Sequence, residues 1–304
     1  MSRRSKIILA TRRSSLALIQ ARAAARALAS VGLASEMLEI TSEGDLDRRN
    51  LVEIGGRGVF TKALEDALLD GRADAAVHSA KDLPSRLPEG LVIAAALPRE
   101  DPRDALVSHT GAPLWDLPAG GVVGTSSPRR AAAILRLRRD LVVKSIRGNV
   151  PTRVRKVESG RYDAGVLAVA GLRRLDMENY IAQVFESDIM PSAPGQGAIV
   201  IETRRQGALD EAIRAVSNAP THVCISAERA LERELQAGCH AAVGALATPV
   251  DGGYMLKAAV FSADGAACWR AEARFCAGQA EAAGEHVARE LLADGAAEAL
   301  AGGP

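Results

Sequence analysis

The feature that most constrains this chain is a regular alternation of short apolar runs with longer amphipathic segments over its first two thirds. Strands that alternate with helices in this way build largely parallel sheets with helices on both faces. The pattern therefore predicts an α/β architecture. We expect strands near residues 7–10, 35–41, 73–78, 91–96, 105–108, 122–124, 142–145, 164–168 and 198–201, and helices near residues 15–31, 60–70, 128–138 and 151–159.

The chain is too long for one ordinary core, because its 304 residues exceed the size at which domains divide. Two proline-containing stretches, Pro98–Arg103 and Pro191–Gly197, interrupt the alternation and mark places where the chain crosses between domains. We predict one α/β domain of residues 1–98 plus 197–216 and another of residues 99–196. The predicted class is two doubly wound, periplasmic-binding-protein-like α/β domains joined by a double-crossover hinge, with a small α+β domain at the C-terminus.

The last third of the chain has a different pattern. An Asp-Gly-Gly turn at 251–253 and an Asp-Gly turn at 264–265 are signals for antiparallel hairpins. We predict that residues 217–304 form this third, α+β domain. Its expected strands lie near residues 243–248, 254–262 and 268–276, and its expected helices near residues 222–236 and 279–300.

No apolar run approaches the roughly 18 to 20 residues of a membrane span, so we expect no membrane insertion. The basic residues that precede Glu36, the first acidic residue, superficially resemble a transit peptide. Residues 7–10 already read as a strand and residues 16–31 as a helix capped by Ser14 or Ser15, so we assign this stretch to the folded domain. No secretory signal is visible, and we expect a cytoplasmic protein.

The four cysteines form no Cys-x-x-Cys pair and have no histidine at zinc-finger spacing. We therefore expect no metal site and no disulfide framework. In a reducing cytoplasm a lone thiol is usually a small buried hydrophobe, which is the simplest interpretation of Cys224, Cys239, Cys268 and Cys276.

Residues 78–84, His-Ser-Ala-Lys-Asp-Leu-Pro, directly follow a strand-like run. In open α/β sheets ligands collect beyond the carboxyl ends of strands, and Pro84 prevents this strand from continuing. Lys81 and Asp82 are therefore expected to face a crevice. On the motif alone they are either a structural ion pair or a catalytic pair.

Three loops share a second pattern, in which a strand is followed by Ser, Thr, Gly and Arg residues and then by a helix N-terminus. They lie at residues 10–14, 124–130 and 145–153. Their hydroxyls, backbone N–H groups and guanidinium groups suit anions. Residues 121–160 also carry ten Lys or Arg residues against two acidic ones, which predicts an anion site in this segment.

The middle loop departs from the usual electrostatics of a helix. Ser127 suits the N-cap and Pro128 the first helical position, so Arg129 and Arg130 fall in the first turn. Helix N-termini are positive, and a cation there costs about 0.3 to 1 kcal/mol unless an anion is nearby. We therefore predict an anion between these two arginines; the alternative is that both side chains splay into solvent.

Taken together, the motifs resemble those of the porphobilinogen deaminase family from end to end. This chain differs from the usual family pattern at Ala237 and Ala242, where Gly and Pro are common, and more mildly at Arg57 and Pro128. The resemblance rests on Ala10–Ser14, Gly55–Phe60, Val77–Pro84, Arg99–Asp104, Gly124–Arg130, Arg147–Val150, Leu167–Leu172 and Gly195–Ala198.

The resemblance implies a transferase that joins four porphobilinogen molecules head to tail, releases ammonia at each step and then hydrolyses free the linear tetrapyrrole hydroxymethylbilane. It also implies a dipyrromethane cofactor, held through a thioether to Cys239, and a catalytic role for Asp82. A carboxylate near the ring N–H would stabilise the cation that loss of ammonia leaves and would assist proton transfer. The residues implied to bind cofactor or substrate are Arg12, Ser14, Lys81, Thr125, Ser126, Ser127, Arg129, Arg130, Arg147, Gly148, Arg153, Arg174 and Gln196.

Two other classes compete with this interpretation. A non-catalytic solute-binding or sensor protein would explain two crossovers, but not Cys239, the third domain or the Lys81-Asp82 pair. A nucleic-acid binder lacks a stacking platform, since aromatic residues make up 3% of the chain. We therefore expect porphobilinogen as a small-molecule partner, a monomer, and no nucleic-acid or membrane partner. Residues 42–58 are either a mobile lid over the crevice or an ordinary solvated loop.

Overall fold

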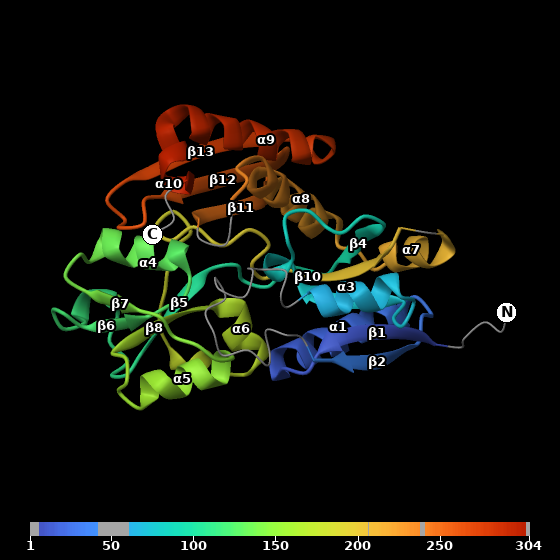
Figure 1. Cartoon of the computed structure of the whole chain (residues 1–304), viewed down its shortest axis with the longest axis horizontal. Helices are drawn as coiled ribbons and strands as arrows, with labels where there is room; N and C mark the ends of the chain where they lie inside the picture. The colour runs from blue at the N-terminus through green and yellow to red at the C-terminus, as the bar shows by residue number, and fades with distance from the viewer. Residues whose placement is uncertain (1–5, 42–60, 206, 238–240, 302–304) are drawn as a thin grey trace. The chain divides into compact units, whose positions relative to one another are not determined.

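The computed structural model describes residues 6–41, 61–205, 207–237 and 241–301 (Figure 1). The chain divides into two compact units. It leaves unit 1 after Glu100 and returns after Gly197, as the two predicted crossovers require. Unit 1 comprises Met1–Glu100 and Ala198–Ile225, and unit 2 comprises Asp101–Gly197 and Ser226–Pro304.

Unit 1 is built on a five-stranded sheet of order β2-β1-β3-β10-β4. Strands β1, β2 and β3 are mutually parallel, whereas β10 runs antiparallel to both of its neighbours. The carboxyl ends of β1 and β3 therefore meet at one edge of the sheet. The strands are β1 (Ile7–Arg12), β2 (Ser35–Ile40), β3 (Ala75–Ser79), β4 (Leu91–Ala96) and β10 (Ile199–Arg204).

The pleat of this sheet sends alternate side chains to two separate cores. Leu9, Ala75 and Val77 pack against one helix, α1, and Ala10 and Ala76 pack against another, α3. These near-continuous apolar runs match a sheet that is covered on both faces. The helices of unit 1 are α1 (Ser15–Ser30), α3 (Lys62–Leu69) and α7 (Gly207–Arg214), and α8 (Ala219–Glu234) begins there.

Unit 2 contains a second five-stranded sheet, of order β7-β6-β8-β5-β9, again with its fourth strand antiparallel to both neighbours. The carboxyl ends of β6, β7 and β8 lie at one edge. The elements are β5 (Asp104–Ser108), β6 (Val122–Gly124), β7 (Val142–Lys144), β8 (Ala164–Ala168), β9 (Ile181–Val184), α4 (Pro128–Leu137), α5 (Val150–Glu158) and α6 (Val169–Arg174).

A third sheet of three antiparallel strands belongs to the same unit, and α9 packs along it (Figure 1). Ala259 and Phe261 of this sheet share a core with Leu106 and Ile134 of the larger sheet and its helix. The part that we predicted as a third domain therefore packs on the second one. Its elements are β11 (Ala242–Val250), β12 (Gly253–Phe261), β13 (Cys268–Phe275), α9 (Ala280–Leu291) and α10 (Ala297–Ala301).

The predicted class, two doubly wound α/β domains and a small α+β domain, is confirmed by these three sheets. The strand at Ile7–Arg12 and the helix at Ser15–Ser30 show that the described part of the basic N-terminal stretch is folded. None of the described helices is both long enough and apolar enough to cross a membrane. The predicted lid at 42–58 lies outside the described residues.

Candidate active site

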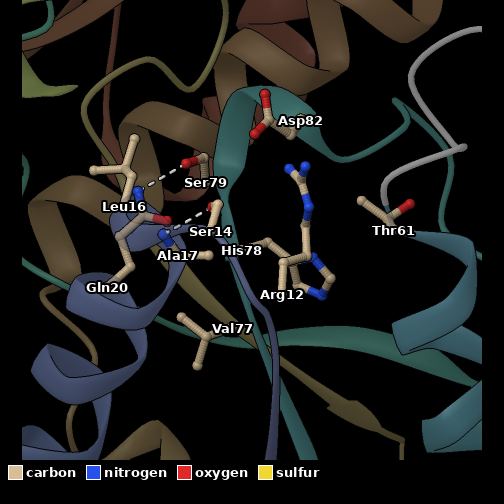
Figure 2. A pocket seen from close by; sticks show the side chains of 10 residues that line it. All are labelled: Arg12, Ser14, Leu16, Ala17, Gln20, Thr61, Val77, His78, Ser79 and Asp82. Carbon is tan, nitrogen blue, oxygen red and sulfur yellow. Dashed lines mark hydrogen bonds between the residues drawn. The ribbon is translucent and has the colours of Figure 1, made fainter. Parts of the chain in front are cut away.

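A small polar pocket of about 50 Å³ lies in unit 1, where β1 and β3 end (Figure 2). The predicted catalytic residue Asp82 lines it, together with the predicted ligand residues Arg12 and Ser14. Lys81, which we also expected to face the crevice, is not among its lining residues. The pocket is lined by Arg12, Ser14, Leu16, Ala17, Gln20, Thr61, Val77, His78, Ser79 and Asp82.

The chain fixes Asp82 by anchoring the residues on both sides of it. Strand β3 ends at Ser79, and a single 3-10 turn, Ala80–Asp82, follows. The Ala80 N–H donates to the Ala198 carbonyl at 3.0 Å, and the Leu83 side chain, 1% exposed, is buried in a small core. The half-buried Asp82 carboxylate is therefore held at the pocket by a short, well-anchored turn.

Arg12 and Ser14 reach the same pocket from β1. Arg12 is the last residue of that strand, and Figure 2 shows its guanidinium group on the same side of the pocket as Asp82. Ser14, one of the two predicted caps, is the N-cap of α1: its hydroxyl oxygen accepts the Ala17 N–H at 3.3 Å. Gln20 of the same helix donates to the Ser79 hydroxyl at 2.8 Å and ties α1 to the end of β3.

The predicted hydroxyl loop of unit 2 follows β6. Ser127 caps α4 and accepts the Arg130 N–H, and the Thr125 hydroxyl oxygen accepts the Ser127 N–H at 3.1 Å. The exposed Ser126 hydroxyl lies 2.8 Å from the Ser145 hydroxyl and donates to the Ile146 carbonyl. The loops after the neighbouring strands β6 and β7 are thereby joined.

The anion predicted between Arg129 and Arg130 is a carboxylate of the chain itself. Asp104, fully buried at the start of β5, lies 2.7 Å from Arg129 Nη1 and 2.7 Å from Arg130 Nη2. The two arginine residues are 3% and 7% exposed, so the alternative of side chains splayed into solvent is wrong. Direct binding of a ligand by these two arginines stays a prediction.

Gln196 belongs to the same buried network. Its amide nitrogen donates to Asp104 at 2.8 Å and to the Pro102 carbonyl at 2.7 Å, and its amide oxygen accepts from Arg130 at 3.3 Å. Arg174, at the end of α6, donates to the Gly197 carbonyl at 2.7 Å. The segment that precedes the return to unit 1 is therefore fixed by the network around Asp104.

The third predicted loop follows β7 and leads into α5. Gly148 has a φ of +111°, and a Cβ there would lie 2.6 Å from Thr152 Cγ2, so the position needs glycine. Arg153 Nε donates to the Gly148 carbonyl at 2.7 Å, and Lys156 donates to the Arg147 carbonyl at 2.8 Å. Two cations thus shape the backbone of the turn that carries Arg147.

Cys239, the predicted cofactor attachment residue, lies outside the described residues. The three described cysteines form no disulfide: Cys224 is buried, Cys268 is half-buried and Cys276 is exposed. The buried Cys224 fits the simplest interpretation of a lone cysteine, whereas Cys276 does not. No group of His, Cys, Asp and Glu among the described residues could hold a metal ion.

The structure also shows residues that the sequence patterns did not single out. Asp104 was noted as part of a motif but not as the partner of the arginines, since the two positions lie about two dozen residues apart. Gln20 and Thr61 line the pocket although neither belongs to a motif. The helical spacing of Gln20, on the face of α1 that packs on the sheet, was the available signal for it.

The donors in each unit suit carboxylate groups. Guanidinium groups, hydroxyls and the N-terminus of α4 gather at strand ends in unit 2, and Arg12 and Ser14 line the pocket in unit 1. Fold and site therefore define the class: an α/β protein with a pocket carboxylate and cationic, hydroxyl-rich loops at its strand ends.

Comparison with known proteins identifies the family within that class. Residues 7–214 match the family model described as porphobilinogen deaminase, dipyromethane cofactor binding domain, and residues 222–293 match the model of the porphobilinogen deaminase C-terminal domain. The chain is 47% identical over 277 residues to a porphobilinogen deaminase of Sorangium cellulosum (strain So ce56), covering 89% of this chain and 91% of the relative. This chain belongs to the porphobilinogen deaminase family, and it is a transferase.

Solved structures with a similar arrangement are more distant. Lipoprotein Tp32 from Treponema pallidum matches with a TM-score of 0.46 and 16% identity, over 72% of this chain and 94% of its own. A nutrient binding protein from Burkholderia cenocepacia bound to methionine matches with a TM-score of 0.44 and 14% identity, over 68% of this chain and 89% of its own. At these TM-scores neither likeness carries an argument about the activity of this chain.

Proposed function

We propose that this chain is a hydroxymethylbilane synthase that joins four porphobilinogen molecules head to tail, releases ammonia at each step and hydrolyses the linear tetrapyrrole free. The observation that carries the proposal is the Asp82 carboxylate in the unit 1 pocket of a chain that matches both family domains. Such a chain serves tetrapyrrole (heme) biosynthesis.

Asp82 acts on the pyrrole ring of the incoming substrate. Loss of ammonia leaves a cationic methylene-pyrrolenine, whose charge is shared with the ring nitrogen. A carboxylate beside that N–H stabilises the cation, and the same group can pass protons to the leaving amine and away from the newly bonded ring carbon. The short anchored turn of residues 80–82 fixes the carboxylate for this role.

The basic residues hold the acetate and propionate groups of cofactor and substrate. Arginine forks suit these carboxylates, because they bind them in bidentate geometry. Arg129 and Arg130 also position the loop at the start of α4 through Asp104. The residues proposed to bind are Arg12, Ser14, Lys81, Thr125, Ser126, Ser127, Arg129, Arg130, Arg147, Gly148, Arg153, Arg174 and Gln196.

The dipyrromethane cofactor provides the covalently held primer on which the pyrrole chain grows. Cys239 is the proposed attachment residue, through a thioether, because of its place in the family motif. We further propose that the protein works in the cytoplasm as a monomer on a small-molecule substrate, without nucleic-acid or membrane partners; its low aromatic content, 3%, supports the last point for nucleic acid.

Replacement of Asp82 by Asn tests the proposal. The variant keeps the size of the side chain but removes the charge that stabilises the cation, so ammonia release should fall at least about 100-fold while the protein still folds. Asp70→Asn, at the exposed end of α3, is the matched control and should release ammonia at the wild-type rate. Near-normal turnover by Asp82→Asn would contradict the assignment, and binding of porphobilinogen without turnover by the wild type would favour a non-catalytic binding protein.

A further inference from the structure

A buried pair of ionisable residues lies behind the Asp82 pocket. His78 Nε2 is 3.0 Å from Glu202 Oε2, and the two side chains are 3% and 0% exposed. The two atoms are close enough for an ion pair, but they are not aligned as a hydrogen bond. Buried charged groups are costly unless they are paired, and the catalytic scheme proposed above does not use either residue.

The register of the sheet explains why these side chains meet. His78 lies opposite Val200 on β10, and Glu202 lies two residues further along the same strand, opposite Ala76. Side chains two residues apart point to the same face, so His78 and Glu202 share the face that α3 covers. Arg12 lies on this face too, two residues after Ala10.

A third member comes from α3. Glu65 is 5% exposed and interacts electrostatically with both Glu202 and His78. Burial, and next the charge of Glu202, raise the pKa of the Glu65 carboxyl above its usual value. Buried polar atoms normally find hydrogen-bond partners, yet Glu65 Oε1 and both oxygens of Glu202 have none among the described residues. Unfavourable local features, such as buried carboxylate oxygens without hydrogen-bond partners, are concentrated at functional sites.

His78 connects this cluster with the pocket. Its side chain is among the pocket-lining residues, whereas Glu65 and Glu202 are not (Figure 2). Three residues separate it from Asp82, and they belong to the end of β3 and the anchored turn. The position of the imidazole ring therefore affects the wall against which Arg12 and Asp82 lie.

We propose that His78 is a further positioning residue of the Asp82 pocket, and that Glu202, backed by Glu65, holds its ring in place. The Glu202 carboxyl group, 3.0 Å from Nε2, fixes the ring from behind, and the ring fixes the pocket wall beside the carboxylate that acts on substrate. This inference rests on the proposed function of Asp82. Small displacements of a catalytic group cost up to about 100-fold in rate, which sets the size of the expected effect.

A double-mutant cycle in the full-length holoenzyme tests the inference. Glu202→Leu and His78→Phe should each lower kcat about 10- to 100-fold and change KM less than threefold, because binding of substrate carboxylates is left intact. The double variant should be no slower than the slower single variant, since the two residues act through one another. Glu202→Gln, which keeps a side chain of the same size and shape against His78, should restore most of the rate.

Thr203→Val is the matched control, because this buried neighbour on β10 faces the opposite side of the sheet and should turn over like the wild type. If Glu202→Leu fails to fold, the nitrogen resonances of the five histidines in Glu202→Gln take its place: the His78 signal alone should shift. Wild-type kcat in Glu202→Leu and His78→Phe, multiplying effects in the double variant, or an unshifted His78 signal would overturn the inference.

Asp82→Asn in the same assay separates the two claims. If it turns over normally, the proposed role of Asp82 fails. If it is inactive while His78→Phe and Glu202→Leu act independently of one another, the positioning role alone fails.

Discussion

At the scale of single residues, the two arginines at the start of α4 show what a local electrostatic rule can predict and what it cannot. The rule that cations are unfavourable at a helix N-terminus predicted an anion beside Arg129 and Arg130. The anion is Asp104. The rule could not identify Asp104 as this anion, because the pairing depends on β5 lying next to α4, which is a long-range property of the sheet. The caps Ser14 and Ser127 depend on neighbours in sequence and could be predicted.

Asp104→Asn should destabilise unit 2 by about 3 to 5 kcal/mol, because it leaves two buried guanidinium groups without their anion. Burial acts to raise the pKa of the Asp104 carboxyl, but Arg129 and Arg130 together hold that pKa well below its usual range. A lowered folded-state pKa stabilises the fold above the unfolded value of about 3.9, and the contribution is lost as pH falls through the folded value.

Urea denaturation of the Asp104→Asn variant should therefore show the same loss at every pH from 5 to 8, and a smaller loss under strongly acid conditions. Asp140→Asn is the control, since Asp140 also pairs with an arginine, Arg138, but is exposed. Its midpoint should stay at the wild-type value. Equal shifts in the two variants would show that burial of the Asp104 network is not what stabilises the unit.

At the scale of elements, the helices with regular apolar spacing and clear caps were predicted from the sequence. Two short elements were not. The helices at Ser15–Ser30, Pro128–Leu137 and Val150–Glu158 lie within a residue or two of their predicted ranges, because caps and apolar spacing are local signals. Helix α6, of six residues, and strand β9, of four, were missed. Elements this short owe their structure to packing against neighbouring strands.

The loop that contains Arg147 and Gly148 is predicted to require glycine at position 148. Gly148→Ala forces a φ of +111° on a residue with a Cβ, and that Cβ meets Thr152, so the variant should lose about 1 to 3 kcal/mol of stability. A smaller fraction of the chains should also carry the cofactor, because the turn that presents Arg147 must shift.

Thermal unfolding and the intact mass of the chain measure these two effects. Gly278→Ala is the matched control, since its Cβ would meet nothing within 4 Å and its backbone has no positive φ. An unchanged melting temperature and full cofactor content in Gly148→Ala would contradict a requirement for glycine in this turn.

At the scale of the whole molecule, the sequence predicted three sheets and the two crossovers, but not which parts share a core. Alternating apolar residues show that a strand has a buried face, without showing which element covers it. Phe261 of the third sheet is 1% exposed and packs in one cluster with Leu106, Ile134 and Phe185. The C-terminal sheet and the second α/β sheet are therefore expected to unfold together.

Phe261→Ala tests this coupling. The cavity should cost about 3 to 5 kcal/mol, and hydrogen exchange should speed up in α4 and β6 as well as in β11 to β13. Faster exchange confined to the third sheet would instead show that it unfolds as an independent domain.

The central claim is that this chain grows a pyrrole chain on a dipyrromethane held by Cys239, with Asp82 as the catalytic carboxylate. The most direct test is the intact mass of the denatured chain before and after brief exposure to porphobilinogen. We predict a mass two pyrrole units above that of the sequence. This increment should be lost in Cys239→Ser and kept in Cys276→Ser. Exposure to porphobilinogen should add further units stepwise, and Asp82→Asn should prevent this addition. A mass equal to that of the sequence, or an increment that survives in Cys239→Ser, would contradict the account.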